Sequence, residues 1–306
     1  MIIATHNGKF HADDVFGVSL LKQLYPDATV VRSRDESVLD SADIVLDVGG
    51  RYNPAEGRFD HHQRDAGERS NGILYSAFGL LWQEYGLQFC EGDASVFRRI
   101  DSRLVEGIDA VDNGQEIYTL NDYGTKPFDL SSVLDLFNPI SSTDEEFDTQ
   151  FELAVVLATQ VLIRLRAKYA GDAAAEREFT ETYEKATDPR FVVLERFVPH
   201  GRAASAQPEL LFTIFPNTNG GWSIQTVKPA DSKFGSRKLL PEPWRGLNGS
   251  DLAAQTGVDS SVFCHKAGFI AAAQTRDGAL QLLELALAEQ FSAHIPSAVF
   301  TVGQES

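Results

Sequence analysis

The stretch FDHHQ at residues 59–63 places an aspartate before two adjacent histidines. Side chains of adjacent residues point to opposite faces of a strand and about 100° apart on a helix. One closed site would therefore not hold both rings in the same way. The chain contains only seven histidines, so the pair is a notable use of this residue. We expect Asp60, His61 and His62 to have different roles in a site that other segments complete.

Three further stretches carry histidines and carboxylates suited to the same site. THNGKFHADD follows the first apolar run, VLDVGG ends another, and EGIDAVDNG closes a predicted helix, and together they supply His6, His11, Asp13, Asp14, Asp47, Asp109 and Asp112. Asp109 and Asp112 are three residues apart and so share one helical face. Taken singly, each has a structural explanation; Asp13, for example, suits a helix N-cap. Their coincidence at one edge of a sheet favours a functional site.

Imidazole and carboxylate ligands without thiolate suit Mn²⁺, Mg²⁺, Zn²⁺ or Fe²⁺. The candidate ligands outnumber what one closed zinc site needs and fit two ions bridged by a carboxylate. Two ions about 3.5–4 Å apart stabilise the attacking and leaving oxygens of a phosphoryl displacement. The sequence contains no GxxxxGK[ST], GxSxG or HExxH motif, so the rival chemistries of those motifs lack support.

The elements that must position these residues alternate along the first half of the chain. Strands are predicted in IIAT, ATVVRS and ADIVLDVGG, and helices in DDVFGVSLLKQLY, NGILYSAFGLLWQEYG (ending at Gly86) and DASVFRRIDSRLVEGIDAVDNG (capped by Asp93 or Ser95). This alternation predicts an α/β fold with a mainly parallel sheet flanked by helices. Ligands bind beyond the carboxyl ends of strands in such sheets. Three of the four stretches lie at or beyond a predicted strand end.

The second half changes character near residues 135–147. A long helix is predicted over FDTQFELAVVLATQVLIRL, a strand in RFVVLERFV, a hairpin turn at NTNGG, a strand and turn in SVFCHKAGFIAAA, and a last helix in ALQLLELALAEQF. We therefore predict two domains, a metal-binding catalytic domain at 1–140 and an α+β substrate-binding domain at 141–306 that closes over the site.

Composition limits the partners. The 27 basic and 44 acidic residues leave a net charge of −17, which opposes a broad nucleic-acid-binding surface but allows one strand end to enter a metal pocket. Cys90 and Cys264 are too few for a disulfide framework. The N-terminus lacks the pattern of a secretory signal, and no apolar run reaches the roughly 18 residues of a membrane span. We expect a cytoplasmic protein.

FDHHQ resembles the signature of the DHH phosphoesterase superfamily. More closely, THNGKFHADD, DIVLDVGG, RFDHHQ, EGIDAVDNG and FCHKAGF are similar, in this order, to motifs of the melanocyte-proliferating-gene (MYG) family. That family has been labelled uncharacterised or a metal-dependent protein hydrolase, and a eukaryotic member is described as a 3′–5′ RNA exonuclease. The resemblance implies a DHH-like domain with two divalent ions, Mn²⁺ foremost, with Mg²⁺ or Zn²⁺ as alternatives.

The resemblance also implies roles for single residues. His6 would open the first metal motif, in which His11 and Asp13 stand where the superfamily has two aspartates, after one extra residue. Asp47 would bridge both ions. His61 and Asp112 would be further ligands, with Asp109 behind Asp112 or in its place.

Around these ligands, Asp60 would orient its neighbours and His62 would face the substrate phosphate, so that Asp47, His61 and His62 form the catalytic group. On the second domain, His265 and Lys266 would contact substrate, and Arg64 is a weaker candidate of the same kind.

The function expected from these motifs is phosphodiester hydrolysis, with a 3′–5′ exonuclease acting on an RNA end or a short oligonucleotide as the leading hypothesis. One alternative is a metal-dependent peptide or amide hydrolase. Another is a non-enzymatic nucleotide- or metal-binding protein. The sequence leaves open the substrate, the ion used and the oligomeric state, a homodimer included.

Overall fold

The computed structural model describes residues 1–64, 66–140, 143–231 and 235–288. The chain forms two compact units, Met1–Ala173 and Ala174–Ser306. Helix α7 (Asp144–Glu184) begins in the first unit and ends in the second. The first unit therefore contains the predicted catalytic domain together with most of α7. The predicted domain boundary at residue 140 stays a prediction, because it concerns function as well as contacts.

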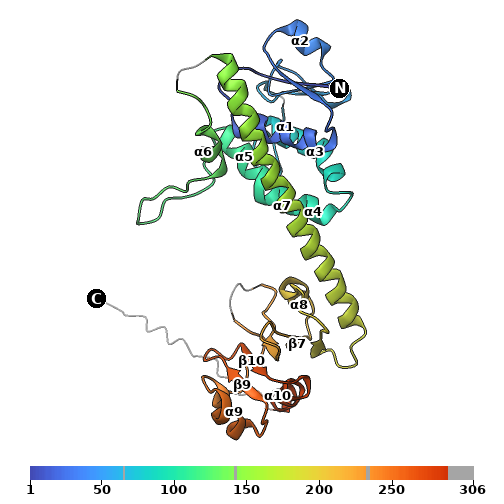
Figure 1. The fold of residues 1–306 in the computed structure, drawn as a ribbon, viewed down its shortest axis with the longest axis vertical. Helices are drawn as coiled ribbons and strands as arrows, with labels where there is room; N and C mark the ends of the chain where they lie inside the picture. The colour runs from blue at the N-terminus through green and yellow to red at the C-terminus, as the bar shows by residue number, and fades with distance from the viewer. Residues whose placement is uncertain (65, 141–142, 232–234, 289–306) are drawn as a thin grey trace, which may run out of the picture. The chain divides into compact units, whose positions relative to one another are not determined.

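A five-stranded sheet organises the first unit (Figure 1), with strand order β2-β1-β3-β5-β4. Strands β1 (Ile2–Thr5), β2 (Thr29–Arg32), β3 (Ile44–Leu46) and β5 (Arg58–Phe59) run parallel. Only β4 (Tyr52–Asn53) is antiparallel, paired with β5. The short 3₁₀ segment η1 (Pro54–Glu56) joins these two strands. The predicted α/β fold with a mainly parallel sheet is confirmed.

Side chains alternate between the two faces of this sheet, as the period of two in a strand requires. Ile3, Ile44 and Leu46 pack into the main core with α1 (Ala12–Leu24) and α3 (Ala77–Phe89). Ala4 and Val45 face the opposite side, in a small cluster that includes residues of α2 (Glu36–Ser41). Both faces of the sheet are thus covered, so side chains of this sheet can reach a ligand only at the strand ends.

Helix α3 does not end at Gly86 as predicted, but continues to Phe89. A Cβ at Gly86 would lie 2.7 Å from the ring of Trp82 and 2.9 Å from that of Phe97. These two rings stack with centroids 5.5 Å apart. Gly86 therefore makes room for aromatic packing inside a helix, and the stop-signal interpretation was wrong because it considered only the local sequence.

The predicted helix over residues 93–114 is present but not uniform. It comprises α4 (Ala94–Ile100), a π-helical turn (Asp101–Val105) and α5 (Glu106–Asp112). Asp93 caps α4 by accepting hydrogen bonds from two backbone N–H groups, as one of the two predictions stated. After Gly114, at φ 69°, the chain leaves the helix and later forms α6 (Leu130–Asp135).

The second unit contains a mixed sheet of order β6-β7-β8-β10-β9. The strands are β6 (Phe191–Val193), β7 (Phe212–Pro216), β8 (Trp222–Thr226), β9 (Ser261–Cys264) and β10 (Ile270–Ala273). The predicted NTNGG hairpin joins β7 and β8, which pair antiparallel. RFVVLERFV forms a strand over only three residues.

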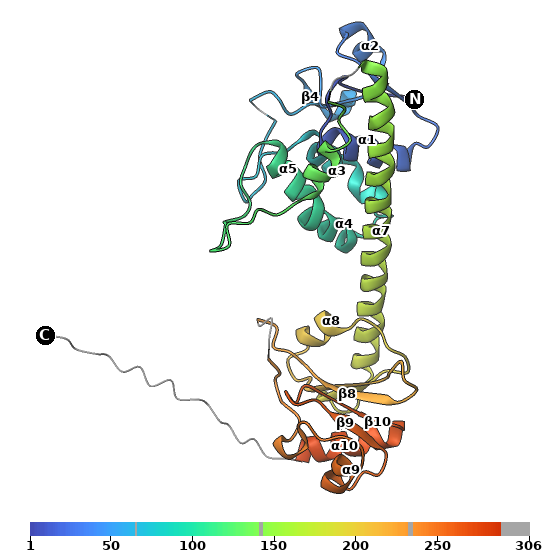
Figure 2. The ribbon, with the colours of Figure 1, turned by 60° about the vertical axis from the view of Figure 1, so that its left-hand side comes forward.

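Helices complete the second unit: α8 (Gly201–Ala206), the 3₁₀ segment η3 (Glu242–Trp244), α9 (Gly249–Thr256) and α10 (Arg276–Ala288). Leu282 and Leu283 of α10 pack with Ile224 and Ala271 of the sheet, and Figure 2 shows α10 beside β10. The end of the predicted last helix lies outside the described residues. Within the described ranges, no helix has the length and apolarity needed to cross a membrane.

The connection into β5 generates a test of the fold. Gly57 has φ 67°, and a Cβ there would overlap the carbonyl oxygen of Asp43. Gly124 has φ 65° but no neighbour within 4 Å. Replacing Gly124 by alanine should lower the free energy of unfolding by about 1–2 kcal/mol at most, through the φ penalty. Gly57→Ala should lower the free energy of unfolding by about 1–3 kcal/mol more than this, because the new Cβ also overlaps the Asp43 carbonyl oxygen. Urea unfolding compares the two, and equal midpoints would contradict this packing.

Candidate metal centre

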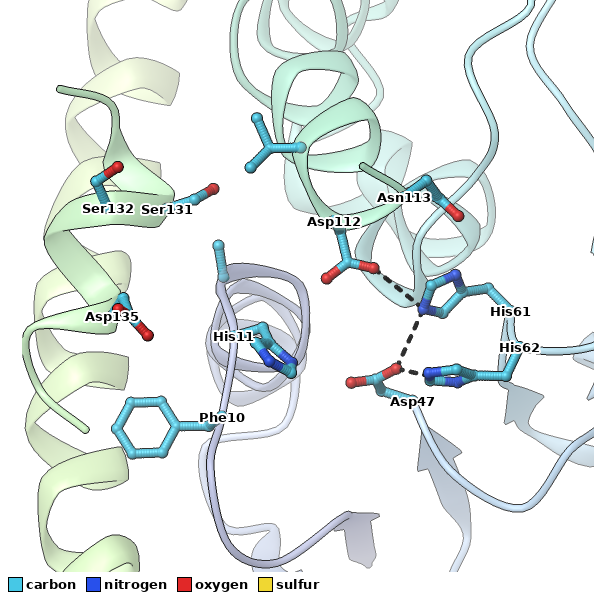
Figure 3. Close-up of a pocket in the computed structure, with 12 residues that line it drawn as sticks. Phe10, His11, Asp47, His61, His62, Asp112, Asn113, Ser131, Ser132 and Asp135 are labelled. Carbon is cyan, nitrogen blue, oxygen red and sulfur yellow. Dashed lines mark ion pairs between the residues drawn. The ribbon is translucent and has the colours of Figure 1, made fainter. Parts of the chain in front are cut away.

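Three neighbouring parallel strands deliver the candidate ligands at their carboxyl ends. His6 follows β1, Asp47 follows β3, and residues 60–62 follow β5. Asp112 arrives from the last turn of α5, so that it faces His61 (Figure 3). The predicted four stretches therefore meet at one edge of the sheet, where open α/β sheets bind ligands.

Asp47 lies at the centre of this cluster and is buried. Its Oδ2 is 3.1 Å from His6 Nε2, and its Oδ1 is 3.3 Å from His61 Nε2. The backbone of Asp47 has φ 56°, in the left-handed region that costs a non-glycine residue free energy. This turn directs the carboxylate across the strand ends, with each oxygen toward a different imidazole.

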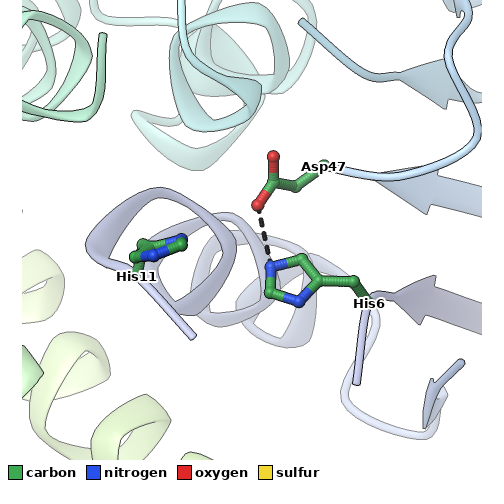
Figure 4. A group of neighbouring side chains, drawn as sticks. All are labelled: His6, His11 and Asp47. Carbon is green, nitrogen blue, oxygen red and sulfur yellow. Dashed lines mark hydrogen bonds and ion pairs between the residues drawn. The ribbon is translucent and has the colours of Figure 1, made fainter. Parts of the chain in front are cut away.

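His6 contributes the first ligand set (Figure 4). Its Nδ1 is 3.1 Å from the carbonyl oxygen of Asn7, which accepts from it, and this contact leaves Nε2 for the cluster. Nε2 is also 3.4 Å from Asp14 Oδ2. The ring of His11 lies across from His6, with centroids 6.1 Å apart. His6, His11 and Asp47 offer ligand atoms that all lie within 4.8 Å of one another.

His61 contributes the second set. Its Nε2 is 3.2 Å from Asp112 Oδ2 and 3.7 Å from Asp13 Oδ2, in addition to its contact with Asp47. His11, Asp13 and Asp112 form a further group with ligand atoms inside 4.8 Å. Asp47 therefore belongs to both sets, as a bridging carboxylate would.

Unpartnered oxygens show that this cluster fits cations. Among the described residues, both carboxylate oxygens of Asp13 and Oδ2 of Asp14 are buried without a hydrogen-bond donor. Buried anions without such partners are strongly unfavourable unless a positive charge compensates them. Burial, Asp47, Asp112 and Asp14 together raise the pKa of Asp13 well above its usual value. These buried histidine and aspartate groups can hold metal ions.

Burial and neighbouring charges also shift the pKa values of the other ionisable groups in the cluster. Burial raises the pKa of Asp14 to about 7, although nearby His6 opposes this rise. Burial lowers the pKa of His6 and of His61, but hydrogen bonding to Asp47 and the surrounding carboxylates outweigh it, so both pKa values are raised. Burial would raise the pKa of Asp47, yet the hydrogen bonds from His6 and His61 lower it overall. Without metal, the cluster therefore retains protons.

The two adjacent histidines have different surroundings, as their spacing predicted. His62 is 64% exposed at its side chain, whereas that of His61 is buried. Asp60 Oδ1 accepts from Nδ1 of His62 at 2.7 Å, and Asp60 Oδ2 accepts from the N–H of Gly50 at 2.5 Å. Asp60 thus holds the His62 ring and links it to the loop that carries Asp47.

A cavity of about 640 Å³ opens over the cluster. His11, Asp47, His61, His62 and Asp112 line one part of it. The facing wall consists of Ser131, Ser132 and Asp135 on α6 (Figure 3). This wall is not evident from the sequence, because α6 is short and carries no motif.

The loop between His6 and His11 is tied to the segment that follows α6. The N–H of Phe10 donates to Asn138 Oδ1 at 3.0 Å, and Asn138 Nδ2 donates to the Phe10 carbonyl at 2.9 Å. Helix α1 begins at Ala12, with His11 at the N-cap, and Asp14 Oδ1 accepts from the N–H of His11 at 2.9 Å. The alternative explanation of Asp13 as the N-cap is therefore excluded, because Asp13 lies inside the first turn of α1. Its carboxylate is free to face the cluster.

Asp109 and Asp112 have separate environments although they share a helical face. Asp109 is buried and accepts from Arg69 Nε at 2.7 Å and from the Ser76 hydroxyl at 2.6 Å. A Cβ on Gly79 would overlap this carboxylate, so glycine is needed there. Asp112, not Asp109, lines the cavity.

No motif in the sequence marks Arg69, which contacts two acids of the following helical segment. Its guanidinium makes a bidentate contact with Asp101, with N–O distances of 2.9 and 2.8 Å, in addition to its bond to Asp109. Asp101 opens the π-helical turn, which brings both acids to the same arginine. Arg69 therefore ties the loop after His61 and His62 to the helix that carries Asp112.

None of the contacts described above involves the remaining candidates. Arg64 is exposed. His265 and Lys266 occupy the turn between β9 and β10 of the second unit, where Lys266 is exposed and His265 Nδ1 accepts from the N–H of Ala267 at 3.1 Å. Their contact with substrate stays a prediction.

Comparison with known proteins identifies the family of this chain. The model of the MYG1 exonuclease family, described as "Uncharacterised protein family (UPF0160)", matches residues 2–287. The chain belongs to this family. A MYG1 protein of Schizosaccharomyces pombe is 32% identical over 93% of this chain and 97% of its own length. The human protein named MYG1 exonuclease is 32% identical over 94% of this chain and 86% of its own. A Saccharomyces cerevisiae MYG1 protein is 29% identical over 94% and 95%.

The contrast between the two acids of α5 can be tested in this MYG1 family member. Asp112→Asn removes a cluster carboxylate, so it should abolish the rise in melting temperature on adding Mn²⁺ while leaving the metal-free melting temperature unchanged or higher. Asp109→Asn should lower the free energy of unfolding of the metal-free protein by about 3–5 kcal/mol, because Arg69 would lose a buried negative partner. Thermal unfolding with and without Mn²⁺ separates them. Identical behaviour of the two variants would contradict these roles.

The retained protons predict a second property. Asp14 titrates at about 7, and the pKa values of Asp13, His6 and His61 are all raised. Metal ligands bind as their deprotonated forms, so metal binding at pH 7 should release protons. Calorimetric titration with Mn²⁺ in two buffers of different ionisation enthalpy measures this release. It should diminish as the pH rises toward 9, and zero release at pH 7 would show that the cluster is already deprotonated.

Proposed function

We propose that this protein is a divalent-metal-dependent phosphodiester hydrolase that acts as a 3′–5′ exonuclease on RNA or short oligonucleotides. The observation that carries the proposal is the placement of Asp47, whose two oxygens face His6 and His61 separately. Such a carboxylate suits a two-ion site. The relatives named exonuclease support the same class of reaction.

The residues that would hold the ions are His6, His11, Asp13, Asp14, Asp47, His61 and Asp112, of which Asp14 is added to the predicted set on the basis of its unpartnered Oδ2. Mn²⁺ is the foremost candidate, with Mg²⁺ and Zn²⁺ as alternatives. When bound, such ions activate water and stabilise charge on the oxygens of a phosphoryl group.

His62 is the side chain best placed to act on the substrate itself. Its Nδ1 is bonded to Asp60, which leaves Nε2 for the cavity that His62 lines. In the protonated form, Nε2 can donate to a phosphoryl oxygen as charge develops there. Asp60 orients the ring through this hydrogen bond. Asp60 is in turn held by the N–H of Gly50, so the donor and Asp47 are attached to one loop.

The charge of the cavity favours entry by a strand end. No lysine or arginine is among the described residues that line it, whereas Asp47, Asp112 and Asp135 are. Successive phosphates along a strand would therefore meet no cationic side chain in the cavity, and one phosphate at the ions is the arrangement that it can satisfy. We include His265 and Lys266 as substrate contacts from the second unit.

Two substitutions separate metal binding from catalysis. Asp47→Asn should abolish Mn²⁺ binding and lower oligonucleotide hydrolysis at least 10³-fold, because removing a group on which both ions depend costs about 4 kcal/mol or more of transition-state stabilisation. His62→Ala should retain Mn²⁺ binding and lower kcat about 10²–10³-fold, the effect of one lost donor. Calorimetry and gel analysis of a labelled RNA measure these effects.

The substrate class is tested with the unmodified protein loaded with Mn²⁺, Mg²⁺ or Zn²⁺. Short RNA and DNA strands labelled at the 5′ end should shorten one nucleotide at a time. Cleavage of peptide amides instead, or full oligonucleotide hydrolysis by Asp47→Asn, would overturn the proposal. Tight metal binding with no turnover of any substrate would favour a binding protein.

A further inference from the structure

An exposed segment rich in large apolar side chains joins the two walls of the cavity. Residues 115–129, called the arm below, connect α5 to α6 without helix or strand. Figures 1 and 2 both show this segment, green and beside α6, projecting from the first unit. Loops of this length without secondary structure are uncommon and are usually functional.

The arm carries large apolar side chains where a surface loop is ordinarily polar. Every residue from 116 to 128 is exposed. Tyr123 is 87% exposed and Phe128 is 70% exposed, and Ile117, Tyr118 and Leu120 are also exposed. Such a concentration marks a surface that contacts a partner. A turn at residues 121–124 shapes the tip, where the N–H of Gly124 donates to the Asn121 carbonyl at 3.0 Å.

Both ends of the arm lie at the cavity. Asn113, just before it, and Ser131, just after it, line the cavity. Gln115 attaches the base by accepting from the N–H of Leu74 at 2.8 Å and donating to the Gly72 carbonyl at 2.9 Å. Asp129 caps α6 by accepting from the N–H of Ser132 at 2.8 Å. A chain that leaves the cavity past Asn113 or Ser131 therefore meets the arm first.

The charge of the arm indicates how it would hold such a chain. It carries three acids, Glu116, Asp122 and Asp129, against the single cation Lys126. Attraction of phosphates by this arm would be weak, as for the protein as a whole at net charge −17. Aromatic rings, in contrast, bind the faces of unpaired bases without regard to charge or sequence.

Resting on the function proposed above, we propose that the arm is a stacking platform for the unpaired bases of a single-stranded oligonucleotide whose end occupies the cavity. Tyr118, Tyr123 and Phe128 present the rings. The ions would bind the reacting phosphate, and the arm would bind bases further along the strand. A base-paired strand conceals its faces, so the arm also selects single strands. Stacking explains how an acidic protein retains a polyanion.

The experiment compares two adenine oligoribonucleotides, one of two residues and one of eight, with the metal-loaded full chain. The double variant Tyr123→Leu, Phe128→Leu keeps apolar area but removes two aromatic faces, and Tyr123→Phe, with Phe128 intact, keeps both faces. The double leucine variant should raise KM for the octanucleotide at least fivefold, leaving kcat and the KM of the dinucleotide unchanged. Tyr123→Phe should behave like the unmodified protein. Leu87→Ser, a change at an exposed leucine outside the arm, is the surface control.

Binding of a fluorescent octanucleotide to the metal-free protein, followed by anisotropy, tests the arm independently of turnover. Affinity should fall in the double leucine variant, and the plot of log K against log salt should have a slope no steeper than about −1.5, since Lys126 of the arm and Lys266 are the two lysines proposed to contact the strand. A steeper slope, near −3, or unchanged binding in the double leucine variant would overturn the proposal. If the unmodified protein binds the octanucleotide but hydrolyses no strand, the proposed function fails and the platform stands.

Two further measurements identify rival occupants of the arm. Sedimentation shows whether the double leucine variant loses self-association, which would assign the arm to a second copy of the chain. Thermal unfolding without oligonucleotide shows whether it loses stability, which would assign the arm to a contact within the chain. Either result, with KM unchanged, would overturn the platform.

Discussion

The burial of one carboxylate between two imidazoles is the constraint on which the rest of the first unit depends. Asp47 can present one oxygen to His6 and the other to His61 only because β3 lies between β1 and β5. The left-handed backbone at Asp47 adds to the cost of this arrangement. Adjacent unpartnered oxygens on Asp13 and Asp14 raise the cost further. A cluster so unfavourable without cations is explained most simply by binding them.

Two arginines with buried side chains, both outside the cavity, stabilise the segments that carry these ligands. Arg69 joins the loop after His62 to Asp101 and Asp109, next to the turn that presents Asp112. Arg32 donates to the Gly8 carbonyl at 2.6 Å and to Asp148 at 2.8 Å, and its guanidinium lies 4.5 Å from the centre of the Phe151 ring. It thereby holds the loop between His6 and His11 against α7. These two arginines thus hold acids and carbonyl groups in position. The ionisable side chains among the described residues that line the cavity are histidines and carboxylates.

This division of charge relates the acidic composition to an exonuclease-type role. A protein that grips phosphates along a strand needs a basic surface, which 27 basic residues against 44 acidic ones do not provide. A cavity that presents anions to bound ions needs no such surface, because the ions themselves attract a terminal phosphate. The remaining affinity can come from stacking on exposed rings such as Tyr123 and Phe128. Under the proposed function, the acidic charge would act against long or duplex nucleic acid and not against the end of a single strand.

The sequence by itself determined the motifs, the parallel sheet and the edge at which the ligands meet. These features are local, because apolar periodicity identifies strands and helices, and the carboxyl ends of parallel strands share one edge. It also indicated that His61 and His62 have different partners, since adjacent side chains diverge. Only the tertiary structure decided which oxygens lack partners, that Asp112 faces the cavity while Asp109 binds Arg69, and that α6 forms the opposite wall. The physical reason is that Arg69 is 40 residues from Asp109 along the chain, and no local pattern records a contact made across that distance.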